Sequence, residues 1–330
     1  MNRILRILKW PAIVIGLFFI GFIAFVQLTW DKEFDAPLPE IVATTDSAMI
    51  ARGQHLAFGP AHCGTCHVPL DKLMEVENGL IMPLQGGWAM SIPPGTFRAP
   101  NITPDEETGI GALSDGQLAR ALRYSVKSDN TCLFPFMPFQ ELSDEDLTAI
   151  ISFLRSQEPV RNEVPPTELT FLGKMVMALG MIKPVGPTQA PPKKVDIDST
   201  VAYGKYLANN VANCVGCHTE RDLKTGEFTG APFAGGLLMP DEGLSDGFGF
   251  VTPNITPHQG TGHMVEWDEK EFIKRFRGGR VYKGTPMPWG SFGRMTDLEL
   301  KAIYRYLKSL DPVENKIEKV VYAPGEELPH

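Results

Sequence analysis

A single uninterrupted apolar block stands near the start of the chain. It runs from Pro11 to Leu28, and Gln27 is its one polar residue. Together with Trp10 it approaches the ~20 apolar residues that a helix needs to cross a bilayer. Trp10 and Trp30 bracket the block, as aromatic side chains do at the two membrane interfaces. The pattern therefore predicts a transmembrane helix within residues 1–30.

The flanks of this block indicate its orientation. Arg3, Arg6 and Lys9 precede it, with no acidic residue among them. The sequence that leaves it, FVQLTWDKEFD, lacks the small-residue cleavage site of a signal peptide. We therefore expect an uncleaved, single-pass anchor in the cytoplasmic membrane. The positive-inside rule then places the N-terminus in the cytoplasm and residues 31–330 on the periplasmic side.

Beyond the anchor, the hydrophobic positions follow the period of a helix. The clearest examples have apolar residues at i, i+3, i+4 and i+7. They are Leu147, Ile150, Ile151 and Leu154 in the first half of the chain, and Leu300, Ile303, Tyr304 and Leu307 in the second. Ser143 and Thr296 are natural N-caps, and Glu299 completes a capping box with Thr296. Further helices are expected near 46–58, 114–126, 199–210 and 265–277. No stretch alternates as a strand would, so the sequence predicts an all-α fold.

Blocks of sequence recur at a nearly constant offset. RGQHLA at 52–57 matches YGKYLA at 203–208, and PNITPDEETG at 100–109 matches PNITPHQGTG at 253–262. The helix LSDEDLTAIISFLRSQEPV at 142–160 matches MTDLELKAIYRYLKSLDPV at 295–313. Such small drift in the offset indicates loop insertions within a duplicated unit that is long enough to fold alone.

The repeat sets the expected domain boundaries. They are an anchor at 1–30, a linker at 31–44, a first domain at 45–160, a proline-rich linker at 161–197, a second domain at 198–315 and a tail at 316–330. The middle of the second linker, Leu169–Ile182, is apolar but too short to span a membrane. We expect it to form a helix in the groove between the domains, with contact to a membrane or partner as the alternative.

Two pentapeptides, CGTCH at 63–67 and CVGCH at 214–218, lie in matching positions of the repeat. A zinc site usually collects its ligands from C-x-x-C elements close in sequence, and a thioredoxin-like motif belongs in a βαβ unit. Neither context is present, whereas C-x-x-C-H is the attachment signature of haem c. Residues i and i+3 of a helical turn face the same way, so both thiols can reach one porphyrin edge. The sequence therefore predicts two covalently bound haems, attached through Cys63, Cys66, Cys214 and Cys217 and bound at iron by His67 and His218.

A sixth iron ligand is expected from one methionine in each repeat. Met137 and Met287 follow the histidine of their own motif at almost the same spacing. Each stands between two prolines, in a loop that follows the middle helix, and such a stiff loop would hold a weak thioether ligand in place. Met82 and Met239, which also precede proline, are the strongest rivals.

These features resemble tandem class I c-type cytochromes, and most of all the cytochrome c subunits of membrane-bound alcohol and gluconate dehydrogenases. The resemblance covers 45–160 and 198–315. It rests on C-x-x-C-H, on NITPDEETGIG and LSDGQLARALR, and on FPFMP before the last helix. It implies four thioethers, His67–Met137 and His218–Met287 ligation of iron, and helix crossings at Gly53 and Gly204. Those subunits usually carry three haems and this chain has two motifs, so the identity of a partner dehydrogenase does not carry over.

Several other side chains invite attention. Asn101 and Asn254, in the repeated NITP loops, could donate to a haem edge or shape a turn. Six arginines could pair with haem propionates or lie on the surface: Arg98, Arg120, Arg123, Arg275, Arg277 and Arg280. His55 and His62 have no counterparts in the second repeat and are expected to be exposed. Cys132 is expected to be a buried free thiol.

The chain has 330 residues and a formal net charge of −8, without the basic footprint of a nucleic-acid-binding protein. The sequence thus predicts a membrane-anchored dihaem cytochrome that transfers single electrons and is not itself an enzyme. Its expected partners are the membrane and redox proteins, namely a dehydrogenase, a quinol-oxidising complex, a soluble cytochrome or a terminal oxidase. Two alternatives stay open: a catalytic dihaem enzyme of the peroxidase or thiosulfate dehydrogenase type, and an integral haem subunit of a larger complex.

Overall fold

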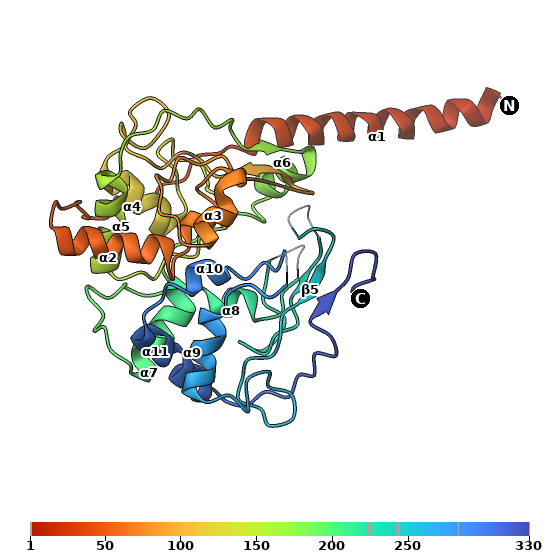
Figure 1. Cartoon of the computed structure of the whole chain (residues 1–330). Helices are drawn as coiled ribbons and strands as arrows, with labels where there is room; N and C mark the ends of the chain where they lie inside the picture. The colour runs from red at the N-terminus through yellow and green to blue at the C-terminus, as the bar shows by residue number, and fades with distance from the viewer. Residues whose placement is uncertain (1, 223–225, 242–244, 283, 330) are drawn as a thin grey trace.

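The structure is a computed structural model that describes residues 2–222, 226–241, 245–282 and 284–329. Helix α1 (Asn2–Thr29) projects from the body of the molecule as one rod (Figure 1). Its stretch Lys9–Thr29 is long and apolar enough to cross a membrane, and hardly any of it is covered by the rest of the protein. It is the one candidate span among the described residues. By length and composition it fits the predicted anchor.

In the first repeat, helix α2 (Ser47–Phe58) crosses helix α5 (Asp144–Ser156) in direct contact. The predicted N-cap of α5 is confirmed, because the Ser143 hydroxyl accepts a hydrogen bond from the backbone of the first turn. The crossing is close because Gly53 has no side chain. A Cβ atom there would lie 1.9 Å from the carbonyl oxygen of Ala149.

The second repeat has the same crossing. Helix α7 (Val201–Tyr206) packs on helix α11 (Asp297–Lys308), and Thr296 closes the predicted capping box of α11. A Cβ atom at Gly204 would also lie 1.9 Å from a carbonyl oxygen, that of Ala302. The two glycine crossings implied by the resemblance are therefore confirmed.

The predicted middle helices are present as α4 (Asp115–Tyr124) and α9 (Glu269–Arg277), each opened by a capping box. The remaining helical elements are short. They are η1 (Cys63–Thr65), η2 (Leu70–Lys72), α3 (Leu73–Glu77), α6 (Phe171–Ala178), the π-turn η3 (Leu207–Val211), α8 (Cys214–Cys217) and α10 (Trp289–Phe292).

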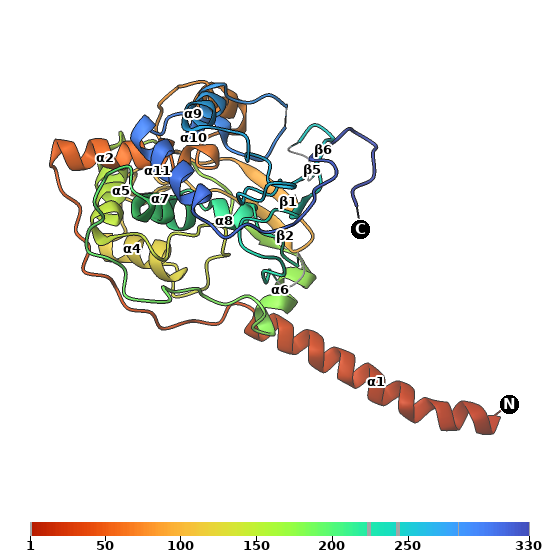
Figure 2. The ribbon, with the colours of Figure 1, turned by 90° about the horizontal axis from the view of Figure 1, so that it is seen from below.

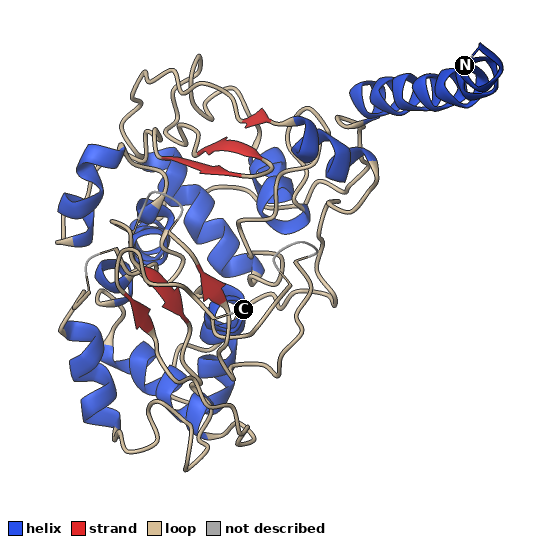
Figure 3. Ribbon diagram, turned by 90° about the vertical axis from the view of Figure 1, so that its right-hand side faces the viewer, coloured by secondary structure: helices blue, strands red, loops and turns tan. Residues whose placement is uncertain are grey.

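The structure also contains two small antiparallel sheets, so the all-α expectation is wrong in this respect (Figure 3). One has the order β1 (Ala89–Ile92), β2 (Gly95–Arg98), β3 (Glu168–Leu169), and the other β4 (Leu238–Met239), β5 (Gly249–Val251), β6 (Val321–Tyr322). These strands are two to four residues long. They are too short to show the alternation over 4–8 residues by which a sequence reveals a strand.

The third strand of each sheet comes from a segment expected to be linker or tail. Strands β3 and β6 begin at Glu168 and Val321, and the final helices begin at Asp144 and Asp297. The two strands are therefore offset along the chain by the same amount as the two helices. The repeated architecture thus continues beyond residues 160 and 315.

The two repeats meet through a buried polar network with an approximate two-fold relation. The Arg52 guanidinium contacts Asp146 of its own repeat at 3.0 Å and Glu299 of the other at 3.1 Å. Its other contact is the hydroxyl of Tyr203 at 3.2 Å, the residue that occupies the position of Arg52 in the second repeat. The centre of the network is therefore the contact between Arg52 and Tyr203, which occupy equivalent positions in the two repeats.

Two further contacts of this network are related in the same way. His55 Nε2 lies 2.8 Å from a Glu299 oxygen, and the Tyr206 hydroxyl lies 2.8 Å from an Asp146 oxygen. Tyr206 occupies the position of His55, and Glu299 that of Asp146, so each first helix reaches the acid of the opposite repeat. This reciprocal pattern is typical of an isologous interface. The expectation that His55 is exposed is wrong, because its tip is needed to pair a buried carboxylate.

The charge of Glu299 is stabilised inside the protein. Burial alone would raise its pKa, but hydrogen bonding and charge from His55, with the Thr296 backbone and Arg52, lower the pKa to about 2. On the other side, burial and the charge of Asp146 raise the pKa of the Tyr206 phenol, which stays a neutral donor. A carboxylate with a lowered pKa stabilises the fold above its ordinary pKa and loses that contribution as the pH falls toward 2.

Helix α6 does not lie in the groove between the repeats, so that expectation is wrong. It packs beside the C-terminal end of α1 (Figure 2). There the Phe171 and Phe22 rings lie 6.5 Å apart. Its N-cap, Thr170, is tied to the first sheet by hydrogen bonds to Pro93 and Pro94. Helix α6 therefore packs at the base of the anchor, against α1 and β3.

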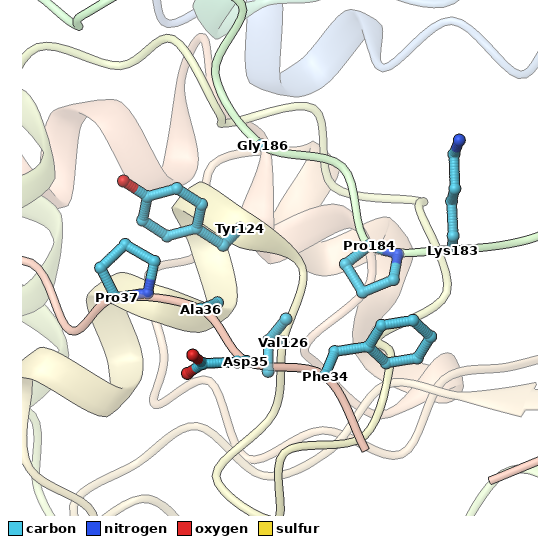
Figure 4. Close-up of a pocket in the computed structure, with 9 residues that line it drawn as sticks. All are labelled: Phe34, Asp35, Ala36, Pro37, Tyr124, Val126, Lys183, Pro184 and Gly186. Atoms are coloured by element: carbon cyan, nitrogen blue, oxygen red, sulfur yellow. The ribbon is translucent and has the colours of Figure 1, made fainter. Parts of the chain in front are cut away.

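A surface hollow marks where the two linkers pass the first repeat (Figure 4). It is lined by residues 34–37 after the anchor, by Tyr124 and Val126, and by Lys183, Pro184 and Gly186 of the second linker. A Cβ atom at Gly186 would lie 3.1 Å from the Tyr124 ring. None of the candidate haem residues lines the hollow.

We expect Glu299→Gln to lower the free energy of unfolding by about 3 kcal/mol at neutral pH, because Arg52 and His55 lose a buried charged partner. Glu271→Gln is the matched control, since Glu271 completes an exposed capping box on α9 and should cost only about 0.5 kcal/mol. Urea unfolding in mild detergent, followed by circular dichroism, measures both. The difference in unfolding free energy between the unmodified protein and Glu299→Gln should shrink as the pH falls from 4.5 toward 2. Equal losses of unfolding free energy in Glu299→Gln and Glu271→Gln would contradict a stabilising role of the buried Glu299 charge.

Candidate functional site

Each pentapeptide folds into one helical turn directly after the first helix of its repeat. The backbone N–H of His67 donates to the carbonyl of Cys63 at 2.9 Å, and that of His218 to Cys214 at 2.8 Å. The residue before each turn, His62 or Asn213, has a left-handed backbone with φ of 44° and 52°. The two copies therefore present two thiols and an imidazole in the same local geometry.

The four thiols of these turns are all free in the structure, which pairs none of them as a disulfide. Burial raises the pKa of Cys63 to about 12 and that of Cys214 to about 12, so both are neutral thiols at physiological pH. A disulfide oxidoreductase needs the opposite shift. Among the described residues, no three His, Cys, Asp or Glu side chains gather as a zinc site would require.

The two histidines are held by backbone carbonyls. His67 Nδ1 lies 2.9 Å from the oxygen of Pro100, and His218 Nδ1 lies 3.0 Å from that of Pro253. A carbonyl can only accept, so Nδ1 carries the proton and Nε2 keeps its lone pair. Burial lowers the pKa of both imidazoles, which favours the neutral form. A neutral imidazole with Nδ1–H fixed by a carbonyl is the arrangement of metal-ligating histidines, so the donor set fits a haem at each turn.

The NITP loops supply these carbonyls. Asn101 Nδ2 donates to the Val160 carbonyl at 2.7 Å, while its Oδ1 accepts from the backbone and hydroxyl of Thr103. Asn254 makes the same bonds to Val313 and to Thr256. Both amides are buried and tie the loop to the chain that follows the last helix. Their expected contact with a haem edge stays a prediction; in the structure they position the prolyl carbonyl next to them.

A repeated Gly-Gly pair, which sequence reasoning missed, completes this arrangement. Gly86 donates its N–H to the His67 carbonyl at 2.9 Å, and Gly235 donates to that of His218 at 2.8 Å. Both have left-handed φ, near 74°, and a Cβ atom at either would lie 2.5 Å from the carbonyl carbon of Pro100 or Pro253. The recurrence of GG and of PNITP in both repeats was the available signal.

The candidate methionines Met137 and Met287 are half-buried and pack on the core. Gln140 of the same repeat donates to the Met137 carbonyl at 3.0 Å. The Met287 loop is instead held from the first repeat, where Glu77 accepts hydrogen bonds from the Gly290 backbone at 2.9 Å and from Arg280 at 3.0 Å. The Met137 loop is thus held by a residue of its own repeat, and the Met287 loop by a residue of the other repeat.

The two rival methionines, Met82 and Met239, differ in their surroundings. Met239 is part of strand β4, paired with Phe250, and not in a free loop. Met82 is half-buried against the core, as Met137 and Met287 are, so burial does not separate it from them.

The contacts between the repeats also reach the first pentapeptide. The Thr65 hydroxyl, between the two cysteines, lies 3.3 Å from that of Ser291 in helix α10, just after Met287. The His62 ring stands edge-on to Phe292 at 5.5 Å. The expectation that His62 is exposed is therefore wrong, because it is half-buried between the repeats.

The arginines considered for propionate binding all have protein partners. Arg98 pairs with Glu168, Arg120 donates to the Lys127 carbonyl, Arg123 pairs with Asp144, Arg275 stacks on Trp289, Arg277 pairs with Asp297 and Arg280 pairs with Glu77. Cys132 is a buried free thiol, as expected, and burial raises its pKa to about 11.

Two unpaired thiols followed by a carbonyl-fixed histidine form, in each turn, the donor set of a haem c attachment site. Residues 201–311 match the cytochrome c family. The chain is 28% identical over 285 residues to the fructose dehydrogenase cytochrome subunit of Gluconobacter japonicus, covering 83% of this chain and 55% of that protein. It is 28% identical to the cytochrome c subunit of the quinone alcohol dehydrogenase of Gluconobacter oxydans, over 81% of this chain and 56% of that protein.

A further relative matches over most of both lengths. The diheme c-type cytochrome of Cereibacter sphaeroides is 26% identical over 277 residues, which cover 80% of this chain and 86% of that protein. By contrast, the chain spans about half the length of the two dehydrogenase subunits. The chain thus matches the cytochrome c family over residues 201–311 and is similar to the cytochrome subunits of alcohol, fructose and gluconate dehydrogenases.

We expect Gly235→Ala to destabilise the protein by roughly 3 kcal/mol, because the new methyl group displaces Pro253 and its bond to His218. Gly279→Ala is the control: Gly279 also has a left-handed φ, 64°, but a Cβ atom there meets nothing within 4 Å. It should cost about 1 kcal/mol, for backbone strain alone.

Urea unfolding gives both values, and a redox titration adds a second measurement. One reduction potential should rise in Gly235→Ala only, because a histidine without its carbonyl partner is a weaker ligand. Equal destabilisation and unchanged potentials in the two variants would contradict the role of this carbonyl.

Proposed function

We propose that the chain is a membrane-anchored dihaem cytochrome c that transfers single electrons as the cytochrome subunit of a membrane-bound dehydrogenase. The observation that carries the proposal is the pair of matching turns, in which each C-x-x-C precedes a histidine with Nδ1 on a prolyl carbonyl. Haem iron held in this way supplies a one-electron couple.

In this proposal, Cys63 and Cys66 form the thioethers of one haem and Cys214 and Cys217 those of the other. His67 and His218 bind iron on one face. The cytochrome c family matches residues 201–311, which form most of the second repeat. The first repeat has the same cysteine turn, glycine crossing and NITP loop. That correspondence supports two tandem class I domains, at 45–160 and 198–315, and two haems.

Met137 and Met287 are the proposed ligands on the other face. Each is half-buried, flanked by prolines and followed shortly by the last helix of its repeat. Gln140 holds the first loop through the Met137 carbonyl, and Glu77 with Arg280 holds the second. A thioether is a weak ligand, so a loop fixed by the protein favours a closed, six-coordinate iron over one with an open position. Methionine also favours the reduced iron and raises the potential.

We further propose that residues 1–30 anchor the chain in the cytoplasmic membrane, with the N-terminus inside and both repeats on the periplasmic side. The exposed, apolar span Lys9–Thr29 and the basic residues Arg3, Arg6 and Lys9 at its N-terminal end support this orientation. The segments 31–44 and 161–197 then act as linkers and 316–330 as a tail, although β3 and β6 within them complete the sheets.

The partner class follows from the relatives, whose names place them in fructose, alcohol and gluconate dehydrogenases. A dehydrogenase is the proposed electron donor. The other proposed redox partners are a quinol-oxidising complex, a soluble cytochrome and a terminal oxidase. The alternative is a catalytic dihaem enzyme, which would need one iron with an open sixth position.

Carbon monoxide separates these functions and tests the methionine ligands at the same time. We expect the dithionite-reduced protein to bind almost none, because both irons are closed. Met137→Ala and Met287→Ala should each bind about one carbon monoxide per chain, whereas the controls Met82→Ala and Met239→Ala should bind none. The change in the Soret band on titration gives the stoichiometry.

Rapid binding of one carbon monoxide by the unmodified protein at neutral pH would contradict the electron-transfer proposal in favour of the catalytic one. No binding by Met137→Ala or Met287→Ala would instead remove that methionine from the iron.

A further inference from the structure

Helix α6 runs along the last turns of α1. The Phe171 ring meets the Phe22 ring edge-on at 6.5 Å. Further along, Lys174 Nζ lies 3.3 Å from Gln27 Oε1 and 5.0 Å from the centre of the Trp30 ring. The first residue of α6 therefore lies deeper along α1 than Lys174, which follows one turn later.

That start lies at the level of the membrane span. The candidate span ends at Thr29, and Phe22 lies about two helical turns before that end. With a helical rise of about 1.5 Å per residue, Phe171 therefore lies about 10 Å inside the end of the span. Lys174, beside Gln27 and Trp30, lies at the rim, where lysine and tryptophan side chains face the interface.

The deep end of α6 is apolar and uncovered. Phe171 and Leu172 are 43% and 42% exposed. Because the Phe171 ring packs on Phe22, this end of α6 adjoins the exposed apolar surface of α1. Leu179 and Met181 are 51% and 52% exposed but lie at the opposite end of α6, near Lys32 and beyond the end of the span. An apolar patch that continues a membrane span at the same depth fits lipid chains better than water.

The helix is also rigidly attached to the haem-binding body. Thr170 donates from its backbone to the Pro94 carbonyl at 3.0 Å, and from its hydroxyl to that of Pro93 at 2.9 Å. A Cβ atom at Gly173 would lie 2.0 Å from the Pro94 oxygen, so α6 sits directly on the β1–β2 hairpin. Leu169, just before α6, pairs with Gly95 in the same sheet.

We propose that the start of α6, residues 171–174, dips into the periplasmic leaflet beside α1 and forms a second contact with the lipid bilayer. The inference rests on the proposed role of α1 as an anchor. A single span leaves the attached body free to rotate about it and to tilt. A second contact, fixed to the first sheet, removes that freedom and holds the body at one orientation to the membrane plane. A redox partner in the same membrane then meets a defined face of the cytochrome.

Spin labels in the full-length protein test this contact. In a Cys132→Ser background, single variants Leu172→Cys, Leu179→Cys, Ile20→Cys and Val281→Cys are labelled and reconstituted in liposomes of phosphatidylcholine and phosphatidylglycerol. Power saturation compares collisions with oxygen, which enriches in lipid, and with a water-soluble nickel chelate. Ile20 (66% exposed) reports on the anchor, and Val281 (66% exposed) is the matched control on the second repeat.

We expect Leu172→Cys to favour oxygen over the nickel chelate as Ile20→Cys does, Leu179→Cys to be intermediate, and Val281→Cys to favour the chelate. A lipid signal at Ile20 with a water signal at Leu172 would overturn the contact and leave the anchor intact. Water signals at both would overturn the anchor itself. Protection of Leu172 from both reagents would show that protein covers it, which would also overturn the proposal.

Discussion

The contact between a bare glycine and a carbonyl oxygen, at Gly53–Ala149 and again at Gly204–Ala302, is the constraint on which the rest of the structure depends. It sets how closely the first and last helices of each repeat cross. The first helix leads directly into the cysteine turn, and the last helix is entered from the methionine loop. The crossing therefore brings together the two segments that carry the proposed iron ligands, which lie far apart in the sequence of each repeat.

The same pair of crossings brings the two repeats together. Arg52 lies beside Gly53, and its contacts with Asp146 and Glu299 join the two final helices at their first turns. The reciprocal contacts of His55 and Tyr206 indicate that a duplicated unit packs on its own copy as a dimer of identical chains would. Duplication within one chain also permits asymmetry. The Met287 loop depends on Glu77 of the first repeat, while the Met137 loop depends on its own Gln140.

The parts of this fold that sequence predicted are those with a local chemical signature. Caps such as Thr296 with Glu299, helical periodicity and the C-x-x-C-H turns all act over a few residues. The strands were missed because each is only two to four residues long, and because β3 and β6 pair with strands that are distant in sequence. Helix α6 was predicted as a helix but misplaced, since its apolar face could fit a groove or a membrane equally well.

In the candidate site, too, sequence predicted the residues with a local signature and missed those that depend on distant contacts. The cysteines and histidines were visible in sequence because their spacing is fixed by one helical turn. Pro100 and Pro253 were missed as histidine partners because a backbone carbonyl has no residue signature, and Gly86 and Gly235 because their need for positive φ depends on packing against those prolines. His55 and His62 were expected on the surface because they have no counterparts in the second repeat. Their partial burial could not be predicted, since their partners, Glu299 and Phe292, come from the other repeat.

The central claim is that both repeats carry a haem on equivalent ligands, and the haem content of the purified full-length chain tests it most directly. The pyridine haemochrome spectrum, with protein measured by amino-acid analysis, should give two haems c per chain. The double variant Cys63→Ala/Cys66→Ala, and likewise Cys214→Ala/Cys217→Ala, should retain one covalent haem. One haem in the unmodified protein, or the same haem content in either double variant as in the unmodified protein, would contradict the account.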